Sequence, residues 1–314
     1  MSLREWAGLT LVLLGSLALW GTEALLLLRA ARRLFDPKLP TPFTQRTRVI
    51  IHLLCVAYAV AFLYARFVEP DKLVLRRLEL TSPKLPPGVS LRIAHATDLH
   101  AQIERRDHLA RAAEAIVDLE PDIVFLTGDF LCNYGRGAPT ALLDFLLRLP
   151  DVPVVAVPGN YGGRIPADPL LEQIGIEILH SERRLRTVND VKLEIYGASP
   201  TRQIDRVPGP EHSERLSIFL EHFPALLPVA ARAGWDLYLA GHTHGGQVRL
   251  PGYGAVVTLD RAGKRFEYGG YRLGETVGMV SAGLGMECRG APQVRFFCPP
   301  EIVLIEIRSA YSSK

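Results

Sequence analysis

The chain has 314 residues, of which 48% are hydrophobic and 22% are charged, and its formal net charge is +3. It is long enough for one large domain or two small ones with a sizeable core. The positive charge lies in the N-terminal segment, because residues 1–80 carry 11 Lys and Arg against 6 Asp and Glu, whereas the rest carries 25 against 27. The larger part has no basic stripe and no patch of interleaved aromatic and basic residues, which excludes a nucleic-acid-binding surface.

Two apolar runs begin the chain. Residues 7–28 contain one charged side chain, Glu23, and residues 49–65 are interrupted only by His52. A helix that spans a membrane needs about 20 apolar residues, with a lower limit of about 17. The competing interpretation of the first run is a cleaved signal peptide, but its apolar core is too long and no clear small-residue cleavage site follows. Residues 1–80 are therefore predicted to anchor the chain in the inner, cytoplasmic membrane.

The loop between the two runs indicates an orientation. Residues 29–48 contain one acidic side chain, Asp36, and six basic ones, which are Arg29, Arg32, Arg33, Lys38, Arg46 and Arg48. Short basic loops lie in the cytoplasm, so the part that follows is exported if both runs span the membrane. If the second run is instead a membrane-associated core helix, the orientation reverses, and the sequence leaves this choice open. Glu23 and His52 are either functional groups within the membrane or partners that face each other.

Apolar strands alternate with amphipathic helices over residues 88–308, which are predicted to form the catalytic domain. Short Val, Ile and Leu runs between helices indicate a sheet that is covered on both faces. We expect an α/β (α+β) fold, namely a two-layer β-sandwich flanked by helices, with His95 in its core and His108 on an exposed helix face. Helices are expected over 106–119, 140–149 and 225–233, and strands over 90–100, 122–130, 153–160, 216–222 and 235–244.

Polar side chains of only three types follow the apolar runs. In open α/β sheets, ligand sites gather at the carboxyl ends of strands. Side chains two residues apart in an extended segment project the same way, so a His-x-His pair can place two imidazoles in one cavity. The candidate site residues are Asp98, His100, Asp129, Asn160, His222, His242 and His244.

Taken in order, the motifs D-x-H, G-D, G-N, H and G-H-x-H resemble those of the calcineurin-like metallophosphoesterase superfamily. The segments AGHTHGGQVRLPG (240–252) and PDIVFLTGDF (121–130) are similar to its YkuE-like branch. The resemblance covers roughly residues 88–308. It implies the metallophosphoesterase fold and a hydrolase that acts on phosphoester or phosphoanhydride bonds.

The resemblance also implies a site for two divalent metal ions. Asp98, His100 and His244 would hold the first ion, Asp129 would bridge both, and Asn160, His222 and His242 would hold the second. Imidazoles together with carboxylate and carboxamide oxygens suit Mn²⁺, Fe or Zn²⁺ better than Mg²⁺, and manganese is the expected ion. Two such ions clamp the phosphoryl oxygens and activate the attacking hydroxide.

One position departs from the family pattern. The superfamily usually has a histidine after the Gly-Asn pair, as the acid that protonates the leaving group, and this chain has Tyr161. An alkoxide leaves poorly without a proton, whereas a phosphate monoester, with a second pKa of about 6, leaves without one. Arg164 lies within reach on the same loop, and a guanidinium suits phosphate oxygens. The departure therefore favours pyrophosphate bonds or activated diesters over alkyl phosphodiesters.

A second resemblance points to a substrate. The UDP-2,3-diacylglucosamine pyrophosphatases of lipid A biosynthesis belong to the same superfamily, one branch lacks the same histidine, and the chlamydial type is YkuE-like with an N-terminal membrane segment. This resemblance implies hydrolysis of UDP-2,3-diacylglucosamine to lipid X and UMP, with a phosphorylated lipid or nucleotide-lipid and the membrane as partners. The alternatives are an exported YkuE-like phosphodiesterase acting on phospholipids or envelope polymers, and a catalytically silent metal-binding membrane protein. The sequence implies no protein partner.

The four cysteines include no CxxC pair. Cys55 lies in the second apolar run and is expected to be a small buried hydrophobe. Cys132 is expected to pack near Asp129 without ligating a metal. Cys288 and Cys298 either form a disulfide or remain free thiols, so the cysteines leave the compartment open.

Overall fold

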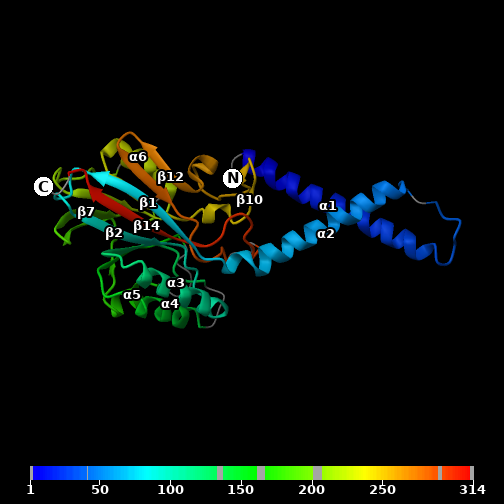
Figure 1. The fold of residues 1–314 in the computed structure, drawn as a ribbon, viewed down its shortest axis with the longest axis horizontal. Helices are drawn as coiled ribbons and strands as arrows, with labels where there is room; N and C mark the ends of the chain where they lie inside the picture. The colour runs from blue at the N-terminus through cyan, green and yellow to red at the C-terminus, as the bar shows by residue number, and fades with distance from the viewer. Residues whose placement is uncertain are drawn as a thin grey trace.

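The computed structural model describes residues 3–40, 42–132, 137–160, 167–200, 207–288 and 292–311. It begins with a helical hairpin of α1 (Leu3–Arg32) and α2 (Gln45–Phe67), which projects from the rest of the molecule (Figure 1). The N-terminus of α1 and the C-terminus of α2 lie at the domain, and the connecting loop lies at the far end. By length and composition, each helix is able to cross a membrane.

Polar contacts join the two helices of the hairpin. The His52 imidazole lies 2.6 Å from the Glu23 carboxylate, so these two groups do face each other. The Ser16 hydroxyl donates a hydrogen bond to Tyr58 Oη at 3.1 Å, and the Trp20 ring meets the Tyr58 ring edge-on. Pairing between the helices satisfies part of the hydrogen-bonding capacity of these groups, which lowers the cost of placing them in an apolar surrounding.

The base of the hairpin is tied to the domain at both of its ends. The Glu5 carboxylate accepts hydrogen bonds from the Thr258 backbone N–H at 2.7 Å and from its hydroxyl at 2.6 Å. At the end of α2, the Ala65 carbonyl accepts from the Arg295 N–H at 2.9 Å. The Glu69 carboxylate accepts from the Cys298 N–H. Buried bonds of this kind give the hairpin a defined position on the domain.

Two six-stranded sheets form the centre of the domain. In the first sheet, β2 to β5 run parallel, and β14 pairs antiparallel with β2 and parallel with β1. In the second, β7, β8, β9 and β13 run parallel, between β6 and β12 as antiparallel edge strands. The order in the first sheet is β1 (Val74–Ser82), β14 (Glu301–Ser309), β2 (Ser90–Ala96), β3 (Ile123–Thr127), β4 (Val154–Val157) and β5 (Glu177–Ile178). The order in the second is β12 (Gly269–Leu273), β13 (Thr276–Val280), β9 (Leu237–Ala240), β8 (Leu216–Leu220), β7 (Val191–Gly197) and β6 (Glu182–Val188).

The sheets pack face to face, with helices on the outside (Figure 1). Inward side chains of both sheets, such as Ile93, Phe125, Ile195 and Leu239, form one buried cluster. The first sheet is covered by α3 (Arg106–Asp118), α4 (Ala138–Leu147) and α5 (Asp168–Gln173), and the second by α6 (Leu227–Ala233). The predicted β-sandwich flanked by helices is confirmed.

Short elements complete the domain: η1 (Glu69–Asp71), η2 (Ile103–Arg105), η3 (Pro224–Leu226), η4 (His244–Gly246), η5 (Gly263–Phe266), β10 (Arg249–Leu250) and β11 (Gly254–Ala255).

Two expectations are corrected here. The sheet begins before residue 88, because β1 pairs along its whole length with β14. His108 is buried and not exposed, because η1 lies against this face of α3, with Asp71 Oδ1 3.9 Å from His108 Nδ1. His95 is in the core as expected, on the same side of β2 as Leu91 and Ile93, and its Nε2 lies 2.8 Å from Thr127 Oγ1.

We predict that His95 makes the domain sensitive to mild acid. Burial lowers the pKa of His95 to about 3, so the folded chain keeps this imidazole neutral, whereas the unfolded chain protonates it near pH 6.5. The unfolded state therefore binds more protons between these values, and stability falls as pH falls below 6.5, by about 2 kcal/mol at pH 5. In His95→Gln, which is neutral throughout and keeps a partner for Thr127, thermal unfolding should depend less on pH between 7 and 5. If the unfolding temperatures of the variant and the wild type fall by the same amount between pH 7 and pH 5, the prediction is wrong.

Candidate metal centre

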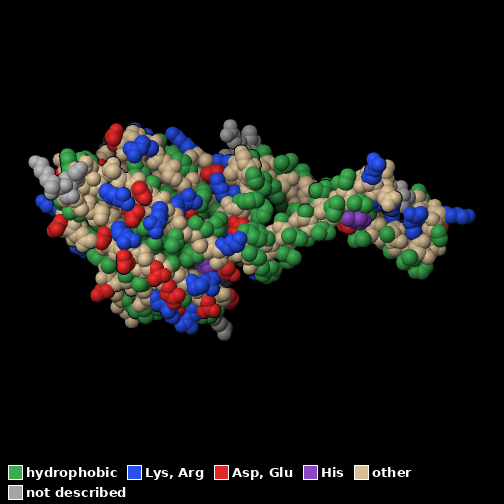
Figure 2. Space-filling model, viewed as in Figure 1, with side chains coloured by type: hydrophobic (Ala, Val, Ile, Leu, Met, Phe, Trp, Pro, Cys, Tyr) green, Lys and Arg blue, Asp and Glu red, His purple; other side chains and the backbone are tan. Residues whose placement is uncertain are grey.

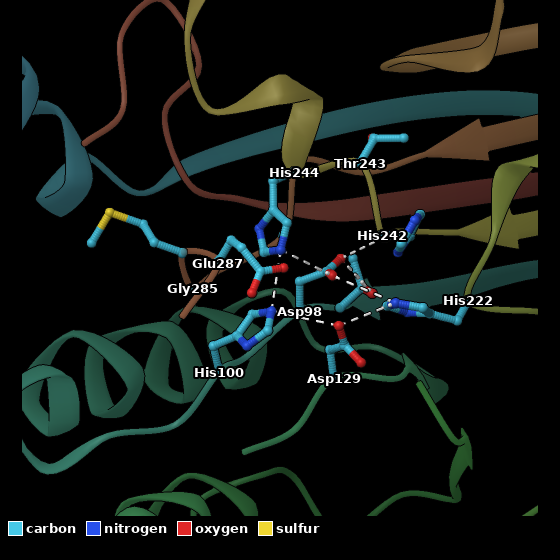
Figure 3. Close-up of polar contacts among 12 residues, drawn as sticks. Asp98, His100, Asp129, His222, His242, Thr243, His244, Gly285 and Glu287 are labelled. Atoms are coloured by element: carbon cyan, nitrogen blue, oxygen red, sulfur yellow. Dashed lines mark hydrogen bonds and ion pairs between the residues drawn. The ribbon is translucent and has the colours of Figure 1, made fainter. Parts of the chain in front are cut away.

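The candidate residues lie on loops that leave the carboxyl ends of strands in both sheets. Asp98 and His100 follow β2, and Asp129 follows β3. His222 follows β8, and the His242–His244 pair follows β9. Figure 3 shows Asp98, His100, Asp129, His222 and His244 pointing toward one centre. These five side chains are also buried, with exposed fractions of 0–4%.

One group of ligand atoms consists of Asp98, His100 and His244. Nε2 of His100 lies 3.1 Å from Nε2 of His244, and Nε2 of His244 lies 3.4 Å from Asp98 Oδ1. These are the three residues expected to hold the first ion. Two imidazole nitrogens and a carboxylate oxygen at this separation form a donor set that suits Mn²⁺, Fe or Zn²⁺.

A second group consists of Asp98, Asp129 and His222. Nε2 of His222 lies 3.3 Å from Asp129 Oδ2 and 4.0 Å from Asp98 Oδ1. Asp129 Oδ2 also lies 3.6 Å from His100 Nε2, which belongs to the first group. Asp129 thus stands between the two groups, which is the place required of a bridging carboxylate. Asp98 belongs to both groups as well, a feature that the sequence did not suggest.

The backbone at the site is held in an uncommon conformation. Asp98, His100, Asp129, His242 and His244 have φ values of 50°, 39°, 52°, 67° and 50°. L-residues seldom adopt positive φ, and such residues gather at functional sites where the surrounding structure enforces them. The glycines of the same loops allow the close approach, because a Cβ on Gly241 would collide with the Asp98 carboxylate and the Thr97 hydroxyl.

Neighbouring groups orient the ligand atoms. Asp98 Oδ2 accepts hydrogen bonds from the Thr97 hydroxyl and from the His242 N–H, both at 2.9 Å. His222 Nδ1 donates to the Thr127 carbonyl at 2.8 Å, which turns its Nε2 toward the carboxylates. Fixing one ring nitrogen by an outer hydrogen bond is how proteins prepare a histidine for a metal.

Two atoms that face the centre are left without a hydrogen bond. Asp98 Oδ1 and His222 Nε2 are buried and make none within the described part of the chain. Buried polar atoms normally have a partner, and a bound ion is one recognised partner for such atoms. The donor set and these two atoms therefore fit divalent cations.

The charges at the site lead to the same conclusion. Burial alone would lower the pKa of His222, but Asp129 and Asp98 outweigh it and raise that pKa to about 10. Burial raises the pKa of Asp98, although His222 opposes this. Without another cation, a proton on His222 thus supplies the positive charge that the two carboxylates require. Metal binding would displace that proton.

The other candidates lie at the edge of this cluster or outside the described chain. Asn160 and His242 line a cavity that also contains His244. The His242 ring lies 5.1 Å from the His222 ring and 4.3 Å from the Phe223 ring, and burial lowers its pKa to about 3. Asn160 is exposed. Tyr161 and Arg164 lie outside the described residues.

The structure corrects the cysteine assignment. Cys132 forms a disulfide with Cys288, and Cys298 is a buried free thiol. The loops after β3 and β13 meet beside the metal centre and bring the Cys132 and Cys288 Cα atoms within 5.9 Å. The Cys298 thiol instead donates a hydrogen bond to the His244 carbonyl at 3.2 Å. The disulfide lies against the site, since Cys288 Sγ is 3.6 Å from His100 Nδ1.

Arg295 is a site residue that the sequence analysis missed. It is fully buried and donates hydrogen bonds to the carbonyls of Ala282 at 2.8 Å and Gly283 at 3.2 Å. This holds the loop after β13, whose Gly285 N–H donates to the Asp98 carbonyl at 2.6 Å. Arg295 therefore positions the backbone under a ligand residue. An isolated arginine in a glycine- and proline-rich segment carries no pattern that would reveal this role.

Comparison with known proteins identifies the domain. Residues 91–246 match the model of the calcineurin-like phosphoesterase family. The metallophosphoesterase YkuE of Bacillus subtilis is 27% identical over 78% of this chain and 89% of its own length. Phosphodiesterase YaeI of Escherichia coli is 26% identical over 80% of this chain and 94% of its own.

A third relative has a named substrate. The UDP-2,3-diacylglucosamine pyrophosphatase LpxG of Chlamydia muridarum is 24% identical over 82% of this chain and 96% of its own length. The residue range that matches the family model, 91–246, includes all seven candidate ligands, which are Asp98, His100, Asp129, Asn160, His222, His242 and His244. The chain belongs to the calcineurin-like phosphoesterases and is a metal-dependent phosphoester hydrolase.

Proposed function

We propose that the chain is a membrane-anchored hydrolase that uses two divalent metal ions to cleave a phosphorylated lipid, with UDP-2,3-diacylglucosamine as the first candidate substrate. The observation that carries this proposal is the direct link between the metal centre and the hairpin. The Cys298 thiol donates a hydrogen bond to the His244 carbonyl, and the Cys298 N–H donates one to the Glu69 carboxylate. Glu69 lies just after the end of α2. A site fixed at the base of two apolar helices lies where the head group of a membrane lipid would present its phosphate.

Each group of ligand atoms would hold one ion. Asp98, His100 and His244 would hold the first, Asp129 would bridge, and His222, His242 and Asn160 would hold the second. Bound there, the ions would supply Lewis acidity at the phosphoryl oxygens and an activated water. Asn160 and His242, which line the open side of the site, would orient the phosphoryl group. Manganese is the proposed ion because the donors are imidazoles and oxygens.

The chemical class of the leaving group is inferred from a residue of the loop after β4. Tyr161 replaces the usual acid, so the bond best suited to this site releases a group that needs no proton. UMP is such a group, because its phosphate has a second pKa of about 6. Arg164 would neutralise the charge that develops on it. The named activity of the chlamydial relative is consistent with this choice of bond.

Release of UMP tests this substrate. The detergent-purified chain with Mn²⁺ should release UMP and lipid X from UDP-2,3-diacylglucosamine. Asp129→Ala should lose more than the roughly 10–100-fold that changing an outer-sphere partner costs. Asp151→Ala, which changes an exposed aspartate, should retain full activity. Turnover of simple phosphodiesters without release of UMP would exclude the substrate, and bound metal without turnover of any ester would indicate a silent protein.

Two observations favour a second candidate, an exported phosphodiesterase that acts on phospholipids or envelope polymers. The basic loop lies at the end of the hairpin farthest from the domain, and such loops lie in the cytoplasm (Figure 1). The Cys132–Cys288 disulfide is typical of an oxidising compartment. Both features favour a domain outside the cytoplasm, whereas UDP-2,3-diacylglucosamine is a cytoplasmic substrate.

The side of the membrane separates the two candidates. A fluorescent protein that matures only in the cytoplasm and a phosphatase that is active only after export are each fused to the C-terminus. If the second candidate is correct, both helices span the membrane and the basic loop is cytoplasmic, so phosphatase activity without fluorescence is expected. That result removes the nucleotide-lipid and retains the exported phosphodiesterase. Fluorescence without phosphatase activity would reverse the choice.

A further inference from the structure

A cavity of about 1760 Å³ joins the metal centre to the hairpin. On the domain side it is lined by Asn160, His242 and His244, and by the segment 256–261. On the other side it is lined by Leu9, Val12, Gly15, Ser16 and Leu19 of α1 and by Tyr58, Ala61, Phe62 and Ala65 of α2. Figure 2 shows that hydrophobic side chains cover the hairpin up to its junction with the domain.

This cavity is larger and more apolar than a site for a phosphate group alone requires. Pockets for small ligands usually measure about 300–1,000 Å³. The part on α1 runs from Leu9 to Leu19, which at about 1.5 Å per residue is about 15 Å. This is half of the hydrocarbon thickness of a bilayer, which is about 30 Å. The space therefore runs from a buried metal centre along surface that, in a membrane, faces lipid.

We propose that the part of this cavity between the hairpin and segment 256–261 is the acyl-chain site of the enzyme, so that the hairpin binds substrate as well as anchoring the chain. The inference rests on the proposed function only in taking the reacting group to be the phosphoryl group of a membrane lipid. The phosphoryl group lies at Asn160 and His242, and the acyl chain lies along α1 and α2. The chain enters from the bilayer sideways and remains in apolar surroundings throughout.

Three features select an acyl chain as the occupant. The cavity is continuous with the metal centre, so one molecule can place its reacting group at the metal centre and its tail along the hairpin. The hairpin contributes mainly aliphatic, aromatic and small side chains, which offer few hydrogen bonds to a sugar or a nucleotide. Transfer of an alkyl chain between two apolar surroundings avoids the cost of exposing it to water, about 0.8 kcal/mol for each CH₂.

Gly15 provides a specific test of this site. A Cβ at Gly15 would meet nothing within 4 Å, so a larger side chain there extends into the cavity without displacing the backbone. Gly21 is the matched control, because it lies on the same helix, also has nothing within 4 Å of its Cβ, and is not part of the lining. Gly15→Phe and Gly21→Phe thus make the same chemical change inside and outside the proposed site.

The test combines binding and kinetics on the full chain in nanodiscs. A phospholipid with a diazirine at the end of one acyl chain should label residues 256–261 of the domain in the wild type and in Gly21→Phe. It should label them weakly in Gly15→Phe. With Mn²⁺, Gly15→Phe should lower kcat/KM for a long-chain phospholipid substrate relative to Gly21→Phe, because the phenyl group occupies space that the acyl chain would fill. Hydrolysis of water-soluble bis(4-nitrophenyl) phosphate should be unchanged in both variants.

The outcomes separate this inference from the proposed function. Labelling that spares residues 256–261, or that is equal in Gly15→Phe and Gly21→Phe, overturns the acyl-chain site even if the enzyme is active. Labelling that Gly15→Phe removes, in a protein that hydrolyses neither ester, supports the site and refutes the hydrolase. An equal loss of activity on the lipid and on the soluble ester in Gly15→Phe shows a general defect and counts against the site.

Discussion

The structure depends on two carboxylates that are buried side by side. Asp98 and Asp129 have exposed fractions of 0% and 2%. Their carboxylate oxygens lie 4.0 Å and 3.3 Å from His222 Nε2. Removing such charges from water costs several kcal/mol for each unless a counter-charge and hydrogen bonds replace the lost hydration. The left-handed backbone at five site residues shows that the loops are built to hold this arrangement. Divalent cations would satisfy this requirement, and they would supply the phosphoester chemistry of the family.

The fold supplies the support that this arrangement needs. Neighbouring parallel strands deliver the ligand loops to one edge of the sandwich, and the close-packed glycines let the loops approach one another. Arg295 fixes the loop after β13, and its own N–H binds the Ala65 carbonyl at the end of α2. Cys298 makes the second link, from His244 to Glu69. The hairpin is therefore part of the framework of the candidate metal centre, which supports the proposal that it guides a lipid toward that centre.

Much of the site could be predicted from the sequence because its signals are local. Each candidate ligand directly follows an apolar strand, and a strand end is easy to locate. β1 was missed because Arg76 and Arg77 make this half-exposed strand resemble a linker, and its partner β14 lies at the other end of the chain. The helical pattern of α3 predicts an exposed His108, whereas η1, a segment distant in sequence, lies against it. The Cys132–Cys288 pair is separated by 156 residues, and spacing alone does not determine cysteine connectivity.

The metal content of the active protein tests the central claim most directly. The full chain is purified in detergent, loaded with Mn²⁺, freed of loose ions and measured by inductively coupled plasma mass spectrometry against protein concentration. Two ions per chain are expected, and fewer than two when Asp129→Asn removes the charge of the proposed bridging carboxylate. An active wild-type protein that retains no ion, or an Asp129→Asn variant that still holds two, would contradict it.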